Sequence, residues 1–311
     1  MAYLLLALAA IFWGGNYVVG HILVQHVDPY GLSLIRWGGT TLLMLALYWK
    51  TFRRDFSTLR ASLGINTLLS FLGQVSFPLS LYIGLQYTTS LNAAIYISST
   101  PCLVLFINHF IFHERISMRN ILGVVASTVG VLYLAFSSTQ GASGVQTFGW
   151  GDVLTIISAL SWAFYCAFLR LKNRAVNNTS FVAFSSMIGT VILLPMFLLH
   201  VTMADNFRGI VYTASPIVIA GIAYLIIFPS WLSYVFWNKG VSLIGTTRSE
   251  IFTHLIPVSG GLMGIVFLGN AFKIYHLVTL VLILLGILCC STPSMRREKP
   301  PRKENPADAA R

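Results

Sequence analysis

The sequence predicts an all-α integral membrane protein in which ten transmembrane helices form two inverted five-helix repeats. Three observations predict this fold. Of the 311 residues, 56% are hydrophobic and only 9% are charged, whereas soluble domains carry about 25% charged residues. Long stretches of the chain contain no Lys, Arg, Asp or Glu, and the two halves repeat the same spacing of glycine and proline. The chain therefore lacks the polar surface that a water-soluble domain needs.

The uncharged stretches divide into segments long enough to cross a bilayer. A hydrocarbon core of about 30 Å requires roughly 20 apolar residues per helix. Residues 61–113 can hold two such helices, and the polar break at residues 84–88 separates them. The segments are continuously apolar and about twice as long as a barrel strand, which excludes a β-barrel. We assign the spans to residues 2–22, 30–49, 62–84, 88–111, 118–137, 150–170, 180–201, 213–238, 244–268 and 273–292.

Basic residues in the connecting loops predict the orientation. Cytoplasmic loops carry an excess of Lys and Arg. The loops on the other face hold only Arg208 and Lys273. Both termini of the multi-pass protein are therefore predicted in the cytoplasm, and the family resemblance described below implies the cell inner membrane. The cytoplasmic set has sixteen members: Lys50, Arg53, Arg54, Arg60, Arg115, Arg119, Arg170, Lys172, Arg174, Lys239, Arg296, Arg297, Lys299, Arg302, Lys303 and Arg311.

The chain repeats itself at a nearly constant offset. Trp13 in the first span meets Trp162 in the sixth when the halves are shifted by 149 residues. Because each half holds an odd number of spans, the second half must enter the membrane from the opposite side, a recurring construction of secondary transporters. We divide the chain into a first repeat (1–137), an external linker (138–149), a second repeat (150–292) and a disordered basic cytoplasmic tail (293–311). At an offset of 156 residues the matching pairs are Gly84 with Gly240, Pro101 with Pro257, and Gly130 with Gly286.

Short motifs in both halves resemble the EamA-type transporters of the drug/metabolite transporter superfamily. The first half has Trp13-Gly-Gly-Asn16, Pro29 followed by Arg36, and Pro101 with Glu114-Arg115; the second half has Gly151-Asp152, Ser161-Trp162-Ala163 with Tyr165, and Leu255-Ile-Pro257-Val. The resemblance implies ten helices in two inverted repeats around a central cavity near the bilayer midplane. It also implies export of amino acids, other metabolites or toxic compounds. The chain departs from the family where Asn270 stands opposite Glu114, since the family often has an acid in both repeats.

Ionisable residues inside predicted spans are candidates for function, because each costs about 2.5–3.5 kcal/mol or more in the bilayer. Arg36 either binds a substrate carboxylate or phosphate with its planar fork or is buried against carbonyls at a helix break. Glu250 and His254 lie four residues apart and share a helix face. Burial favours the neutral form of a carboxyl group, so the pair suits proton coupling. The alternatives are that Arg248 and Glu250 reach water at the cytoplasmic end, and that His254 is a hydrogen-bonded packing residue.

Aromatic and amide residues within the spans complete the predicted substrate site. Tyr and Trp are also common at membrane interfaces, and Asn in a span also joins helices, so each has a structural alternative. Trp13 and Trp162 occupy equivalent points near mid-span, where an apolar floor of a cavity is the better interpretation. With Arg36, the predicted substrate-binding residues are Trp13, Asn16, Tyr82, Tyr96, Trp162, Tyr165, Trp231, Tyr234 and Asn238.

Four prolines and one acid are predicted to take part in gating. Pro78 and Pro229 are expected to kink their helices, and Pro257 frees the carbonyl of Thr253 because proline has no amide hydrogen. Pro101 stands at the equivalent point of the first repeat, and Glu114 is assigned by the resemblance.

Motifs for other functions are missing from the sequence. It contains no GxxxxGK[ST] loop for ATP, and no GxSxG, HExxH or CxxC motif. We expect no cofactor, no metal and no enzyme activity. The predicted function is secondary transport that exports an amino acid or related compound by alternating access, with protons as a candidate coupling ion and membrane lipid as the surroundings. A facilitator or importer of another organic solute stays open, as does, more remotely, a membrane-embedded enzyme acting on lipid. The sequence leaves both a monomer and a homodimer open.

Overall fold

The computed structural model describes residues 1–114, 116–139, 149–204, 209–268 and 274–291. Most of the predicted external linker, the predicted basic tail and Asn270 lie outside the described residues. Within them the chain is helical, apart from turns and one isolated bridge between Val27 and Val211. The first half contains α1 (Ala2–Leu23), α2 (Pro29–Ala61), α3 (Leu63–Ser70), η1 (Phe71–Ser76), α4 (Phe77–Gly84), α5 (Ser90–Ile97), α6 (Thr100–Phe110) and α7 (Met118–Thr139). The second half contains α8 (Trp150–Phe168), η2 (Leu169–Leu171), α9 (Asn178–Met203), α10 (Pro216–Leu225), η3 (Ile226–Leu232), α11 (Ser233–Ile244), α12 (Thr246–Glu250), η4 (Ile251–His254), α13 (Leu255–Leu268) and α14 (Ile274–Ser291).

Several of these helices are long and apolar enough to cross a membrane, which confirms the prediction of an all-α multi-pass membrane protein. Two shorter apolar helices, Met118–Tyr133 and Leu277–Cys289, add to them. The six long candidates are Ala2–Leu23, Leu63–Gly84, Asn92–Phe110, Trp150–Leu171, Asn178–Met203 and Pro216–Ile244. A total of ten spans stays a prediction.

The helix α2 runs further than the predicted span 30–49. It begins at an Asp28 N-cap, whose side chain accepts a hydrogen bond from the Gly31 amide, and proline at the first helical position suits such a start. Its backbone leaves helical geometry at Tyr48 and then continues to Ala61. The last part buries Phe52 and Leu59 while Arg53 and Arg54 face outward. The basic residues thus end the apolar span but not the helix, because one face still packs.

The four predicted hinge prolines all lie at departures from regular α-helix. Pro229 is inside the π-helical segment η3, and Pro78 is the second residue after the π-helical segment η1. Pro101 begins α6 after a break at Ser98 and Ser99, and Pro257 follows the 3₁₀ segment η4. Proline cannot donate to the helical ladder, so the backbone near each one must find other partners. Whether these breaks move in gating stays a prediction.

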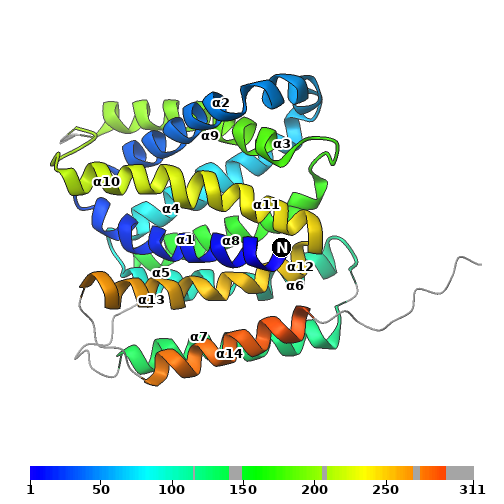
Figure 1. Cartoon of the computed structure of the whole chain (residues 1–311). Helices are drawn as coiled ribbons and strands as arrows, with labels where there is room; N and C mark the ends of the chain where they lie inside the picture. The colour runs from blue at the N-terminus through cyan, green and yellow to red at the C-terminus, as the bar shows by residue number, and fades with distance from the viewer. Residues whose placement is uncertain (115, 140–148, 205–208, 269–273, 292–311) are drawn as a thin grey trace, which may run out of the picture.

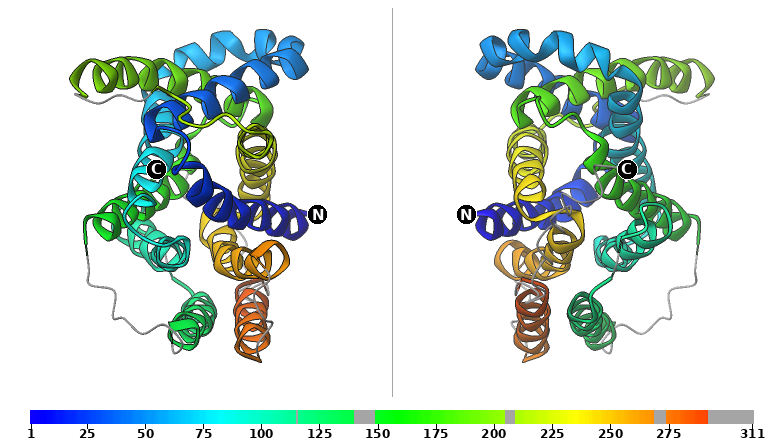
Figure 2. Two further views of the ribbon diagram at one scale, coloured as in Figure 1. Left: turned by 90° about the vertical axis from the view of Figure 1, so that its left-hand side faces the viewer. Right: turned by 90° about the vertical axis from the view of Figure 1, so that its right-hand side faces the viewer.

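The helices pack side by side with α1 and α8 near the middle (Figure 1). Along one margin α2 packs on α9, and along the opposite margin α7 packs on α14 (Figures 1 and 2). Each of these pairs joins a helix from the first half of the chain to one from the second. The two halves are therefore intertwined rather than separate bodies.

A close backbone contact at Gly151 joins the turn after α4 to the start of α8. A Cβ atom at Gly151 would lie 2.8 Å from the Tyr87 carbonyl carbon and 2.9 Å from the Gly84 oxygen. Asp152 strengthens the contact, because its carboxylate accepts hydrogen bonds from the Thr88 hydroxyl at 3.0 Å and the Gly149 amide at 2.9 Å. Only glycine fits at residue 151 without moving the backbone.

We expect Gly151→Ala to lower the free energy of unfolding by about 1–3 kcal/mol, the usual cost of overpacking. Gly64→Ala is the matched control, because nothing lies within 4 Å of a Cβ atom there and alanine favours a helix by about 0.8–1 kcal/mol over glycine. Thermal unfolding in detergent measures both. Equal melting temperatures for Gly151→Ala and the unmodified chain would contradict the packing argument.

Candidate functional site

A cluster of aromatic rings from both halves occupies the centre of the protein. The rings of Trp13 (α1) and Trp162 (α8) meet edge to face with centroids 4.7 Å apart, and each is at most 2% exposed. Tyr165 stacks on Trp162 at 5.1 Å. Tyr234 on α11 lies 5.8 Å from Trp13. The structure thus brings four predicted site residues together in one packed cluster.

Arg36 lies beside this cluster and is completely surrounded by protein groups. Its side chain is 0% exposed. The guanidinium donates to the Ser230 hydroxyl at 2.5 Å, the Tyr82 hydroxyl at 2.6 Å and Asn16 Oδ1 at 3.1 Å. A longer bond of 3.4 Å reaches the carbonyl of Pro229 in η3. The contacts match the interpretation of Arg36 as a group buried against a helix break, and no carboxylate pairs with it within the described parts of the chain.

Two asparagine–tyrosine pairs repeat between the halves. In the first half Tyr82 on α4 donates to Asn16 on α1 at 2.9 Å. In the second half Asn238 on α11 donates to the Tyr165 hydroxyl on α8 at 3.1 Å. All four residues were predicted for the substrate site, and each pair fastens two helices of one half.

Glu250 and His254 are buried ionisable residues, and Glu250 contacts the aromatic cluster. Glu250 is 1% exposed, and its Oε1 accepts a hydrogen bond from Trp162 Nε1 at 3.2 Å, while its Oε2 has no hydrogen-bond partner among the described residues. His254 is 0% exposed and contacts the Ser98 carbonyl through Nε2 at 2.8 Å. Glu250 therefore contacts the predicted site through Trp162, and His254 fastens η4 to the break between α5 and α6.

Two predicted substrate residues lie apart from the cluster. Tyr96 on α5 interacts with Asp152 at the start of α8. The indole of Trp231 lies 6.4 Å from the Tyr48 ring, beside the kink of α2.

Two tryptophan rings that were not predicted from the sequence belong to the aromatic cluster. Trp37 follows Arg36 and lies 5.1 Å from Tyr234, and Trp237 lies 5.1 Å from Trp13. Trp237 follows Tyr234 by three residues, a helical spacing that could have indicated it.

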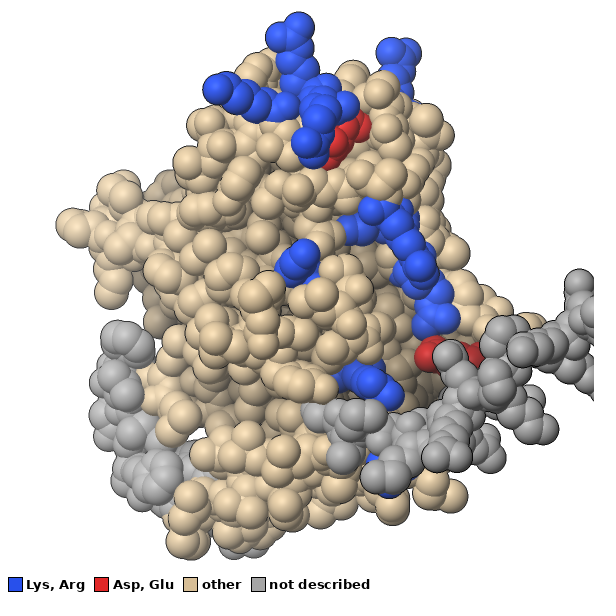
Figure 3. Space-filling view, turned by 45° about the vertical axis from the view of Figure 1, so that its right-hand side comes forward, with Lys and Arg blue, Asp and Glu red and all other residues tan. Residues whose placement is uncertain are grey.

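A cavity of about 1160 Å³ opens among the basic loops. Lys and Arg side chains gather around this hollow in the space-filling view (Figure 3). One wall comes from the segment after α8 and the start of α9, the other from α11 and α12. Its lining includes Asn238, so it extends from the loops to the edge of the aromatic cluster.

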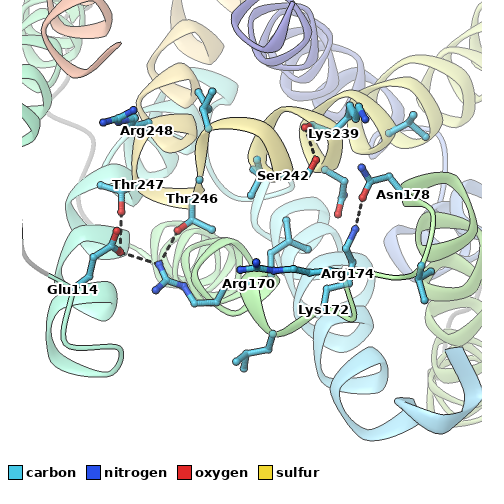
Figure 4. Close-up of a pocket in the computed structure, with 18 of the residues that line it drawn as sticks. Glu114, Arg170, Lys172, Arg174, Asn178, Lys239, Ser242, Thr246, Thr247 and Arg248 are labelled. Carbon is cyan, nitrogen blue, oxygen red and sulfur yellow. Dashed lines mark hydrogen bonds and ion pairs between the residues drawn. The ribbon is translucent and has the colours of Figure 1, made fainter. Parts of the chain in front are cut away.

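Glu114 closes one side of this cavity by joining three elements. Its Oε2 accepts a hydrogen bond from Arg170 at 2.9 Å and from Thr247 at 3.3 Å (Figure 4). Arg170 also donates to Thr246 at 3.0 Å. The carboxylate is 43% exposed, and exposed ion pairs contribute about 0–1 kcal/mol. Glu114 can therefore break and remake these contacts at little cost, as its predicted role in gating requires.

Comparisons with known proteins identify the family. A family model described as the EamA-like transporter family matches residues 1–136 and 149–292. The chain belongs to the EamA-like transporter family. It is thus a multi-pass membrane transporter, as the motif resemblance predicted.

Relatives of this EamA-like transporter match it over most of their length. The uncharacterized transporter YetK of Bacillus subtilis is 25% identical, and the match covers 92% of this chain and 85% of YetK. A probable amino-acid metabolite efflux pump of Salmonella typhimurium is also 25% identical, with 90% and 91% covered. A solved crystal structure shares the fold of the EamA-like chain with a TM-score of 0.73 at 16% identity, covering 93% of this chain and 96% of the other.

Proposed function

We propose that this chain is a secondary transporter that exports a small polar or amphipathic metabolite, an amino acid or related compound, by alternating access. The observation that carries the proposal is the cavity of about 1160 Å³ that opens among the basic loops and ends at Asn238, beside the aromatic cluster. Basic loops face the cytoplasm, so the cavity is a cytoplasmic entrance for a solute that leaves the cell. The probable efflux pump among the relatives supports the same direction.

Ten spans in two inverted repeats, residues 1–137 and 150–292, are part of this proposal. Contacts between residues that are equivalent in the two halves support it, because such residues meet only near an axis that relates the halves. Trp13 touches Trp162, and His254 touches Ser98, 156 residues earlier. The two π-helical segments η1 and η3 likewise occur at matching points of the halves.

On the face opposite the cavity, backbone contacts join the two halves, which supports an inward-facing state. The loop after α1 is tied to the loop before α10 by two backbone hydrogen bonds. One joins the Asp28 amide to the Ile210 carbonyl at 2.9 Å, and the other joins the Tyr212 amide to the His26 carbonyl at 2.8 Å. In alternating access these contacts open when the cytoplasmic entrance closes. Both termini then lie in the cytoplasm, and residues 138–149 form an external linker.

Glu250 is the proposed proton-coupling group, with His254 beside it on η4. The carboxyl group is buried and contacts Trp162 of the aromatic cluster, so its protonation can respond to a substrate bound there. The substrate-binding residues proposed are those of the cluster and of the two asparagine–tyrosine pairs, together with Arg36.

Reconstitution into proteoliposomes tests the proposal. Labelled amino acids and nucleobases are screened for uptake with and without an imposed pH gradient. We expect saturable flux of at least one solute above protein-free liposomes. If correctly folded protein moved none of them at any gradient, transport of this class would be refuted. Imposing solute gradients of each sign then distinguishes export from a facilitator or an importer.

A further inference from the structure

The cavity carries much more positive than negative charge. Among the described residues its lining holds one carboxylate, that of Glu114, which already binds Arg170. The other cations of the lining make no ion pair within the described ranges. Cytoplasmic loops are expected to carry Lys and Arg, but this rule does not explain why five of these side chains line one cavity. The five cationic side chains are those of Arg170, Lys172, Arg174, Lys239 and Arg248.

Lys172 is a half-buried cation of this lining. Its ammonium group donates to Asn178 Oδ1 (Figure 4) and lies 5.0 Å from the ring of Phe181. Burial first, and then the charge of nearby Lys239, lower the pKa of Lys172 to about 8. An anion beside both ammonium groups would offset their repulsion and replace lost hydration.

The start of α9 also lines the cavity. Asn177, Asn178 and Thr179 line the cavity, and they are the N-cap and first residues of a 26-residue helix. Helix N-termini attract anions through their amides and the helix dipole. At this one the Asn177 amide already donates to the Asp55 carboxylate at 3.1 Å, and the Thr179 amide donates to the Asn177 side chain at 3.0 Å. The positive charge on the two walls therefore comes from the lysines, with Lys239 on α11 and Lys172 after η2.

We propose that the cavity binds the phosphate or carboxylate oxyanion of an anionic ligand between Lys172 and Lys239. This inference rests on the proposed transport function. The exported metabolite is then an organic anion, and its oxyanion group binds in this cavity. The same chemistry is offered by a soluble metabolite and by the headgroup of an anionic lipid in the cytoplasmic leaflet. Asn238 lies at the inner end of the cavity, at the edge of the aromatic cluster. An uncharged part of the bound ligand would therefore lie next to the cluster.

Binding of radiolabelled inorganic phosphate to the purified full chain tests the site. The protein is kept in neutral detergent at fixed ionic strength and pH 7, where Lys172 is cationic. We expect saturable binding that weakens about tenfold in Lys239→Gln, the usual effect of losing one charged hydrogen bond. Lys239 is exposed, so this change spares the fold, and Lys239→Arg keeps the charge and most of the affinity. Arg53→Gln is the matched control, since Arg53 is exposed on α2 and does not line the cavity.

Nanodiscs distinguish the two sources of the oxyanion. Phosphate binding is repeated in discs of phosphatidylcholine alone and in discs containing phosphatidylglycerol. Undiminished phosphate binding in both supports a soluble anion, and competition by phosphatidylglycerol that Lys239→Gln abolishes supports a lipid headgroup. Equal phosphate binding by the unmodified chain, Lys239→Gln and a Lys239→Glu variant would overturn the anion site. Because this assay needs no transport, that result would leave the flux proposal standing, whereas absent flux with intact binding would overturn transport alone.

Discussion

Replacing Arg36 with methionine is expected to reduce transport about 100-fold while leaving the protein folded. The guanidinium joins α2 to Asn16, Tyr82 and Ser230 on three other elements. We expect two of these bonds to change between the two states of alternating access, and two charged hydrogen bonds of 1.5–3 kcal/mol each correspond to a factor of about 100 or more. Folding is less affected, because the desolvation penalty of several kcal/mol for a buried cation disappears with the charge. We expect the free energy of unfolding to change by less than about 2 kcal/mol for this reason.

The matched control for Arg36→Met is Ser33→Ala. Ser33 lies on the same helix, is fully buried, and its hydroxyl makes no hydrogen bond to the described residues. Flux in proteoliposomes and thermal unfolding in detergent are measured for both variants. Turnover of folded Arg36→Met equal to that of the unmodified chain would remove Arg36 from the transport mechanism. A large loss of stability with proportional loss of folded protein would assign Arg36 a purely structural role.

Replacing Glu250 with glutamine is expected to abolish the response of transport to a pH gradient while leaving exchange intact. The amide oxygen of glutamine can still accept the hydrogen bond from Trp162 Nε1, but glutamine cannot carry a proton. With one proton exchanged per solute, the unmodified chain accumulates substrate about tenfold per pH unit, since one unit is 1.36 kcal/mol. The glutamine variant should equilibrate the solute without accumulation.

Glu114→Gln is the control for Glu250→Gln, because it shows whether removing another carboxylate also abolishes the response to pH. Glu114 is 43% exposed at the rim of the cavity, so its removal should keep the response to pH. Solute accumulation is followed in proteoliposomes at imposed gradients of zero, one and two pH units. Accumulation by Glu250→Gln that still follows the gradient would contradict proton coupling through this residue.

The fold and part of the centre could be predicted from the sequence because hydropathy and repeat spacing are local signals. The spacing aligned Trp13 with Trp162, and their rings are in contact. The span assignment stopped α2 at residue 49, because it followed charge and not the buried face that continues through Phe52 and Leu59. Tyr96 is a candidate for the substrate site on its residue type alone, and the structure places it beside Asp152, outside the aromatic cluster.

The basic cavity could not be predicted, because its walls come from segments that are distant in sequence. Arg170, Lys172 and Lys239 counted only as topology signals in the sequence, and each is unremarkable in its own loop. Only packing of the segment after α8 against α11 brings them to one cavity. The places of Trp37 and Trp237 in the aromatic cluster could not be predicted either, because the rotation of each helix decides which rings face the centre.

Labelling of single cysteines from each side of the membrane tests the central claim, that the two halves are inverted repeats, most directly. In a chain without its four natural cysteines, Ser57→Cys places an exposed thiol between the predicted spans 30–49 and 62–84. Thr213→Cys places one at the equivalent point of the second half, in the loop between α9 and α10. A membrane-impermeant maleimide is applied to intact cells and to inverted vesicles. The account predicts that Ser57→Cys reacts only from the cytoplasmic side and Thr213→Cys only from the outside. Reaction of both from the same side would contradict it.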